Sequence, residues 1–336
     1  MKRRIYTGRE KKEITKKIIF FIAVIIIFFA AVAVLSKVAE QRKAPSSDTE
    51  EASEVVEIHG IKCTPKTNIR TWLFIGADKQ GSAEEVEGEE NPGQSDVLEL
   101  VVLDKTAGTY TRLSINRDTM TEVRSLEPDG TDLGTAKVQI ALAHASGDGL
   151  EMSCENTVEA VSGLLYGQKI DGYVSLGMDG IPILNHLSGG VTVTIEDDFS
   201  KEDPSLKQGE TITLSDEQAM HFVRGRMGVG DGTNENRMKR QRQYLEALKP
   251  LLMEKCRQDN EYPLKMYDEL ADYMVTDMSR NDFIKVAAAL LDARETEPAQ
   301  IEGTSAIGDW GFNEFTPDED SLAETVVDLF YDRVEK

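Results

Sequence analysis

Residues 97–103 read Val-Leu-Glu-Leu-Val-Val-Leu, an almost continuous apolar run that predicts a strand buried on both faces. The turn-forming stretch 104–108 follows it, and residues 110–115 predict an antiparallel partner strand. Upstream, the aromatic and β-branched residues of 69–76 predict another strand. These three segments therefore predict the centre of a β-sheet, and the rest of the chain is interpreted around them.

Helical and strand patterns alternate through the remaining body. A capping box of Ser215 and Gln218 opens one of the helices. The other patterns predict strands at 172–176 and 191–195, and helices at 137–146, 157–166, 180–187, 215–223, 236–255, 267–273, 280–293 and 320–331. This alternation predicts an α/β fold with a mixed central β-sheet and helices on both faces, a three-layer sandwich.

The N-terminal region has the pattern of a membrane anchor. Residues 1–17 carry eight basic and two acidic side chains, a net charge of +6 in a chain whose total is −22. Residues 18–35 form an uncharged apolar run, and these 18 residues would span about 27 Å as a helix, close to a bilayer core. The positive-inside rule predicts one transmembrane helix at 18–36, with the N-terminus cytoplasmic and the body outside. A cleaved signal peptide is the alternative, since Ala31-Val32-Ala33 has the form of a cleavage site.

These patterns give four expected regions and exclude several functions. The expected regions are a cytoplasmic basic segment 1–17, the transmembrane helix 18–36, an extracytoplasmic linker 37–66 and a catalytic domain 67–336 with C-terminal helices. A charge of −28 outside the first 17 residues argues against a nucleic-acid partner. Three cysteines and four histidines without CxxC or HExxH spacing argue against a disulfide framework or a zinc site.

Two aspartates lie where neighbouring strands end and begin. Asp78 follows the strand 69–76, and Asp96 directly precedes the strand 97–103. If these strands pair, both carboxylates lie at one edge of the sheet, where with a phosphate they suit Mg²⁺. Each aspartate capping a turn is the alternative interpretation.

Basic residues mark two further candidate positions. Arg117 follows the strand 110–115, where a local pair with Asp118 is the alternative to a site role. The second position is a cluster of six basic residues within residues 224–242, for which a solvated basic face is the alternative interpretation. Positions 237 and 241 share one helix face. Guanidinium groups bind phosphate bidentately, which favours an anion site made from Arg224, Arg226, Arg237, Lys239, Arg240 and Arg242.

These pieces, in this order, resemble the extracytoplasmic LytR–CpsA–Psr family of Gram-positive cell-wall enzymes. The resemblance spans about residues 69–250 and is carried by Phe74–Asp78, Ser95–Val97, Leu113–Thr119, Lys137–Ala141, Gly189–Val193, Leu214–Ala219, Val223–Arg226 and Asn236–Gln241. Three positions depart from the common family pattern: Gln94 where Arg is frequent, Asn116 where Pro is frequent, and Gln139 where Asn is usual.

The resemblance implies a membrane-anchored phosphotransferase. It would move a glycopolymer, such as a teichoic acid or capsular polysaccharide, from an undecaprenyl-pyrophosphate carrier to a peptidoglycan hydroxyl. By resemblance, Asp78 and Asp96 would hold Mg²⁺, with Mn²⁺ possible in its place. The implied catalytic residues are Arg117, Arg224 and Arg226, and the implied pyrophosphate-binding residues are Lys137, Arg237 and Gln241.

A polyprenyl carrier also needs an apolar slot. Helices 158–165 and 181–187 are apolar enough to line one, although core packing explains them equally well. Alternative functions remain: a polyprenyl-pyrophosphate pyrophosphatase, or a non-catalytic module that binds a lipid pyrophosphate or polysaccharide. A transcription attenuator is disfavoured because a 17-residue cytoplasmic segment is too short to fold as a DNA-binding domain.

Overall fold

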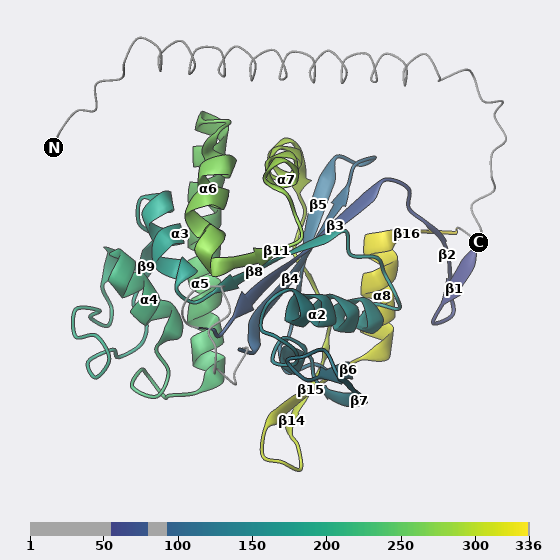
Figure 1. The fold of residues 1–336 in the computed structure, drawn as a ribbon, viewed down its shortest axis with the longest axis horizontal. Coiled ribbons are helices and arrows are strands. Elements are labelled where there is room, and N and C mark those ends of the chain that lie inside the picture. The colour runs from purple at the N-terminus through teal and green to yellow at the C-terminus, as the bar shows by residue number, and fades with distance from the viewer. Residues whose placement is uncertain (1–54, 80–92, 335–336) are drawn as a thin grey trace, which may run out of the picture. The chain divides into compact units, whose positions relative to one another are not determined.

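A computed structural model describes residues 55–79 and 93–334 (Figure 1). Its centre is a seven-stranded sheet in the order β11-β8-β3-β4-β5-β12, with β13 also paired to β5. The strands are β3 (Ile69–Ala77), β4 (Ser95–Asp104), β5 (Thr109–Ile115), β8 (Gly172–Gly177), β11 (Met274–Thr276), β12 (Arg294–Glu295) and β13 (Ala299–Gln300).

The sheet is mixed, as expected. β4 lies between β3 and β5 and is antiparallel to both, so the predicted central strands and their hairpin are confirmed. β8 runs parallel to β3, and β12 and β13 run parallel to β5. The apolar run of β4 sits in the middle of the sheet because successive side chains must be covered on both faces.

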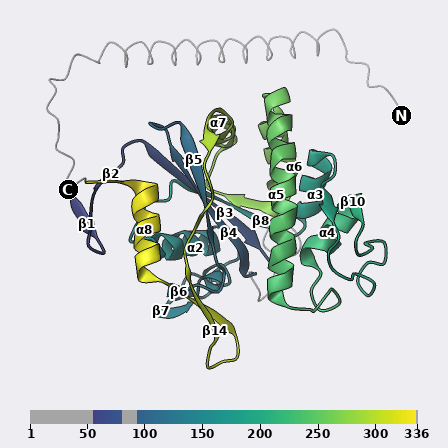
Figure 2. The same cartoon turned by 180° about the vertical axis from the view of Figure 1, so that it is seen from behind.

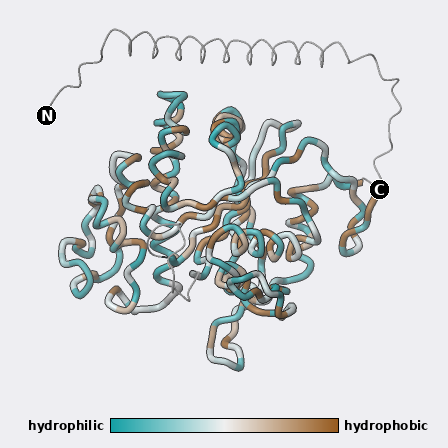
Figure 3. The backbone as a smooth tube through the Cα atoms, viewed as in Figure 1, coloured by the Kyte–Doolittle hydropathy of each residue, from teal (hydrophilic) through white to brown (hydrophobic). Residues whose placement is uncertain are grey.

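Helices cover both faces of this sheet (Figures 1 and 2). Leu98, Leu100 and Val102 of β4 pack in one core, whereas Val101 and Leu103 pack in the other. Figure 3 shows hydrophobic stretches gathered in these central strands. On one face lie η1 (Ile140–Ala143), α2 (Glu151–Leu164) and α8 (Glu319–Phe330), and on the other α3 (Gly180–Ser188), α4 (Asp216–Arg224), α5 (Asn234–Gln258), α6 (Tyr262–Leu270), η2 (Ala271–Tyr273) and α7 (Arg280–Asp292).

Four smaller sheets lie outside the central sheet within the described residues. β9 (Thr192–Thr194) pairs with β10 (Thr211–Thr213), β6 (Met120–Leu126) pairs with β7 (Asp132–Gln139), and β14 (Gly303–Ile307) pairs with β15 (Asn313–Pro317). Strands β1 (Val56–Ile58), β2 (Ile61–Pro65) and β16 (Tyr331–Arg333) form a three-stranded sheet, in which β2 is central. Residues 56–65 were expected in the linker, but pairing with the chain's last strand makes them part of the folded body.

One predicted helix is wrong. Residues 137–146 were expected to be helical, but residues up to Gln139 extend β7, and only residues 140–143 form a short 3₁₀ turn. The reason is a non-local pairing, because β6 and β7 form a hairpin in which Lys137 lies opposite Glu122. The capping box of Ser215 and Gln218 is confirmed at the start of α4.

No helix within residues 55–79 and 93–334 is both long and apolar enough to cross a membrane. The expected anchor at 18–36, the cytoplasmic segment 1–17 and the linker up to residue 54 lie outside the described residues, as does most of the acidic loop after Lys79.

Candidate functional site

A β-bulge places Asp96 at the edge of the central sheet. Gly76 pairs with Val97, but the next residue, Ala77, pairs with Ser95, so Asp96 is the extra residue of β4. A bulge re-aims the side chain that it inserts. Gly76 permits the close approach there, because a Cβ at this position would lie 3.0 Å from that of Val97.

The buried Asp96 carboxylate lies between two buried arginines. Arg117, which directly follows β5, donates from Nη1 to Asp96 Oδ1. Arg237, in the first turn of α5, places Nη2 at 2.7 Å from Asp96 Oδ2. Three segments distant in sequence therefore meet at one carboxylate, and two guanidinium groups compensate its burial.

Asp78 completes the carboxylate pair. It follows β3 directly, and its backbone N–H donates to the Gln94 carbonyl at 2.8 Å, which continues the strand pairing past the bulge. Its Oδ2 lies 3.9 Å from Nη1 of Arg237, and its side chain is 42% exposed. The predicted convergence of Asp78 and Asp96 at one sheet edge is therefore confirmed, with Arg237 between them.

Arg117 has a crowded electrostatic environment. Its Nη2 donates to Gln94 Oε1, and its Nε lies 3.5 Å from Asp118 Oδ1, so the expected local pair exists beside the longer-range one. Burial lowers the pKa of Arg117, and the positive charges of Arg237 and Arg226 act in the same direction against Asp118 and Asp78. The pKa of Arg237 is likewise lowered by burial. A bound anion would relieve both groups.

The members of the basic cluster around α5 differ in burial and in their contacts. Arg224 ends α4 and is exposed, as is Arg226 in the loop that follows. Arg226 is close enough to Arg117 to influence it electrostatically. Gln241, one turn after Arg237, is buried and donates weakly to the Val223 carbonyl at 3.5 Å. Arg237 and Gln241 therefore do share the helix face that points to the site.

Lys137 stands apart from this set. It is exposed on β7, and no hydrogen bond or ion pair joins it to the cluster within residues 55–79 and 93–334.

Two residues contribute in ways that sequence reasoning missed. Gln94, noted only as a departure from the family pattern, accepts from Arg117. Arg240, grouped with the anion-binding residues, instead donates to the carbonyls of Phe222 and Gly225 and to Asp197.

The carboxylates suit a Mg²⁺ ion that shares its coordination with a substrate. Asp96 Oδ2 is buried and lies in an ion pair with Arg237, but it accepts no hydrogen bond there. Asp78 is partly open. Within the described ranges no three His, Cys, Asp or Glu side chains form a possible metal cluster, so an all-protein cage does not fit. Mg²⁺ held by one or two carboxylates plus phosphate and water does fit.

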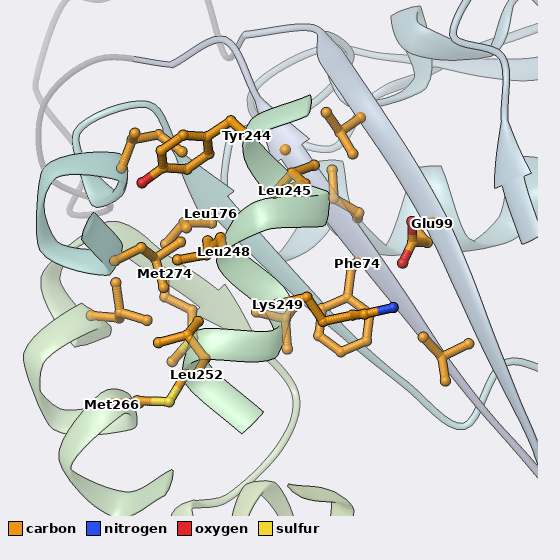
Figure 4. Close-up of a pocket in the computed structure, with 18 of the residues that line it drawn as sticks. Phe74, Glu99, Leu176, Tyr244, Leu245, Leu248, Lys249, Leu252, Met266 and Met274 are labelled. Carbon is orange, nitrogen blue, oxygen red and sulfur yellow. The ribbon is translucent and has the colours of Figure 1, made fainter. Parts of the chain in front are cut away.

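An apolar cavity of about 410 Å³ opens from this cluster. Asp96 and Gln241 line it together with Leu176 from β8, Leu248 from α5 and Phe283 from α7. Figure 4 shows Leu176, Leu245, Leu248 and Met274 gathered around the slot, with Glu99 and Lys249 beside Phe74. The slot thus joins a charged end to a long apolar wall.

The two helices that were expected to line a slot divide between the faces of the sheet. Ile181 and Leu184 of α3 line the cavity. Val161 and Leu164 of α2 belong to the core on the opposite face, together with α8, so core packing is the correct interpretation for 158–165. Helices α5, α6 and α7 supply most of the remaining wall, with Leu252, Met253, Met266 and Leu290 among the lining residues.

Known proteins share this fold and parts of this sequence. The TagU polyisoprenyl-teichoic acid–peptidoglycan teichoic acid transferase of Halalkalibacterium halodurans is 33% identical over 156 residues, which are 46% of this chain and 46% of that protein. The chain thus spans about half the length of the curated relatives it matches.

Solved structures agree on the architecture. The crystal structure of gbs0355 from Streptococcus agalactiae superposes with a TM-score of 0.62 at 20% identity, covering 80% of this chain and 90% of that one. B. subtilis TagV superposes with a TM-score of 0.57 at 24% identity, covering 79% and 96%. The LytR_cpsA_psr family model matches residues 28–329, and the chain therefore belongs to the LytR–CpsA–Psr family.

Proposed function

We propose that the protein transfers a cell-wall glycopolymer from an undecaprenyl-pyrophosphate carrier to a hydroxyl of peptidoglycan. The observation that carries the proposal is the continuity of one cavity, in which Asp96 and Gln241 share the lining with Leu248 and Phe283. A lipid pyrophosphate has the same division, with a charged head and an apolar tail. The printed name of the TagU relative describes transfer of teichoic acid to peptidoglycan by that protein.

The charges around Asp96 suit phosphoryl transfer, which depends mainly on positioning and neutralisation of charge. In the proposed reaction, the acceptor hydroxyl oxygen forms a P–O bond to the transferred phosphoryl group and its proton is released to solvent. The P–O bond to the carrier phosphate breaks, and the electron pair leaves with the polyprenyl phosphate. Arg117 and Arg237 would bind the pyrophosphate oxygens from the buried side, and Arg224 and Arg226 would approach from the exposed side. Gln241 would donate at the mouth of the slot.

Asp78 and Asp96 would hold Mg²⁺, or Mn²⁺, and the bound ion would draw negative charge from the phosphate oxygens. The pyrophosphate-binding role of Lys137 stays a prediction of the family resemblance, because no contact within the described part of the chain joins its exposed side chain to the cluster. We also propose that residues 18–36 anchor the chain in the cell membrane, with a cytoplasmic N-terminus and an extracytoplasmic body. The apolar run and its basic flank support this orientation.

The test uses the full-length chain in detergent, with a short-chain polyprenyl-pyrophosphoryl glycan as donor. Mass spectrometry should detect a co-purifying polyprenyl phosphate, and transfer to a peptidoglycan oligosaccharide should exceed hydrolysis. Product formed only with water as acceptor would instead identify a pyrophosphatase. Tight lipid binding without bond cleavage, under every metal condition, would identify a binding module.

The metal is tested separately. Chelation should abolish transfer, and added Mg²⁺ or Mn²⁺ should restore it. Asp96→Asn keeps the size of the side chain while removing its charge, so it should abolish activity even with added metal. Asp129→Asn, on the exposed β6–β7 turn, is the matched control. Full activity of Asp96→Asn in the presence of a chelator would exclude the metal assignment.

A further inference from the structure

The β14–β15 hairpin carries an apolar tip for which the proposed transfer site has no use. Trp310 is 87% exposed, Ile307 is 71% exposed and Phe312 is 66% exposed. Single exposed apolar residues are ordinary, but three on one hairpin form a patch that indicates a binding surface. Figure 1 shows the hairpin projecting from the body, and Figure 2 shows the same from behind.

The β15 strand of this hairpin is fixed next to the candidate site. Asp118, the neighbour of Arg117, accepts from Asn313 Nδ2 at 2.8 Å, and its carbonyl accepts from Phe315 N–H at 2.8 Å. Gln139 donates to both Asp118 Oδ1 at 3.2 Å and the Asn313 carbonyl. Trp310 is only three residues from Asn313, so its Cα lies within about 10 Å of that anchor. A ligand on the tip would therefore lie beside the Arg117 end of the site.

The charge of the hairpin narrows the choice of ligand. Residues 302–318 contain four acidic residues and no basic one. The adjoining hairpin, residues 120–139, has four acidic and two basic residues. Membrane-docking segments carry Lys or Arg toward anionic lipid, so this surface would be repelled by it. An anionic donor polymer and a second acidic hairpin would be repelled in the same way.

We infer that the tip formed by Ile307, Trp310 and Phe312 binds an uncharged, hydroxyl-rich glycan strand, the acceptor side of the proposed transfer. The flat indole ring offers a face on which a sugar ring can stack. Asp309 and Glu314 flank it with carboxylate oxygens that accept hydrogen bonds from hydroxyls. This inference deepens the proposed function and rests on it for the identity of the reaction, but glycan binding itself is measured without catalysis.

The first experiment is a titration of the full-length chain in detergent with a tetrasaccharide of β-1,4-linked N-acetylglucosamine. The chain has two tryptophans, and Trp72 is buried in the core, so a change in emission on glycan addition reports on Trp310. Trp310→Ala should weaken binding, measured by calorimetry, at least tenfold, whereas Trp310→Phe should restore part of it. Tyr166→Asn is the control, because it removes an exposed aromatic ring from the end of α2 where the backbone has φ of 57°, a conformation that Asn tolerates.

The second experiment compares acceptor kinetics and competing ligands. In the transfer assay, Trp310→Ala should raise the acceptor KM at least tenfold. Most of the fall in kcat/KM should come from this rise in KM and not from a lower kcat. Glycan binding in a chain that shows no transfer would retain this inference while overturning the proposed function. Unchanged glycan affinity in Trp310→Ala would overturn it, as would Trp310-dependent binding to phosphatidylglycerol vesicles or Trp310-dependent self-association without glycan binding.

Discussion

Helix α5 carries two buried arginine–aspartate pairs only three residues apart, and they differ in how completely they are satisfied. Arg240, 3% exposed, places Nη1 at 2.6 Å from Asp197, donates to the Phe222 and Gly225 carbonyls, and lies over the Phe199 ring at 5.3 Å. Arg237, 6% exposed, lies at 2.7 Å from Asp96, but its Nε finds no hydrogen-bond acceptor.

The difference separates a structural arginine from a binding one. The Arg240 contacts close the turn between α4 and the Gly-rich loop, and nothing about them calls for a ligand. At Arg237, the Nε without a hydrogen-bond acceptor and the pKa lowered by burial indicate that the ion pairs with Asp96 and Asp78 leave part of the guanidinium unsatisfied. Equal burial of the same residue type on the same helix therefore does not imply an equal role.

The largest expected effect is on stability, at Arg240. Arg240→Ala leaves Asp197 without its guanidinium, and breaking a buried pair in this way costs about 3–5 kcal/mol of unfolding free energy. Denaturant unfolding followed by circular dichroism measures it. A change no larger than that of an exposed variant would mean that Arg240 is not structural, and the comparison would fail.

Arg237→Ala should affect activity much more than stability, the opposite of Arg240→Ala. Asp96 keeps Arg117, and one of two mutually repelling guanidiniums is lost, so the unfolding free energy should change by less than about 1 kcal/mol. The transfer rate should suffer instead, with kcat/KM falling by about 2–4 kcal/mol in transition-state stabilisation. Loss of stability equal to that of Arg240→Ala, with activity retained, would contradict the distinction.

Arg226→Ala tests whether the exposed part of the cluster contributes. Arg226 lies in the loop that the Arg240 contacts position, and it influences Arg117 electrostatically. Because solvent screens an exposed guanidinium, we expect a smaller loss, about 1.5–3 kcal/mol, the range for one hydrogen bond to a charged group. The measurement is kcat/KM at two salt concentrations, and the loss should shrink at the higher one.

Arg242→Ala should have the smallest effect. Arg242 is exposed on α5, and successive helix positions point about 100° apart, so it turns away from the face of Gln241. We expect less than about 0.5 kcal/mol in both kcat/KM and unfolding free energy. If Arg242→Ala and Arg226→Ala lost activity equally, the exposed arginines would be a solvated face and not a clamp.

The sequence predicts the strands better than it predicts the site. The apolar run 97–103 and the turn 104–108 that precedes residues 110–115 are local signals, and both strands form where expected. The helix predicted at 137–146 fails because the β6–β7 pairing, which no local pattern encodes, takes residues up to Gln139. The bulge that aims Asp96 is likewise a property of the β3–β4 register and not of either strand alone.

The roles of the basic residues were the hardest to predict. The spacing of Arg237 and Gln241 correctly indicated a shared face, since helix periodicity is local. Which arginine would meet Asp96 and which would meet Asp197 depended on packing between α4, α5 and the sheet. The alternative interpretation of the cluster was a solvated basic face, and local spacing did not indicate that Arg240 would instead pair with Asp197 in the interior.

The strand β16 has a consequence for self-association of the body. Its residues 331–333 pair with β2, whose residues 61–65 lie far from them in sequence. Without β16, β2 would have an open edge, of the kind that pairs with other chains. A variant cut before Tyr331 should therefore self-associate through β2, so β16 protects the folded body against edge-to-edge aggregation.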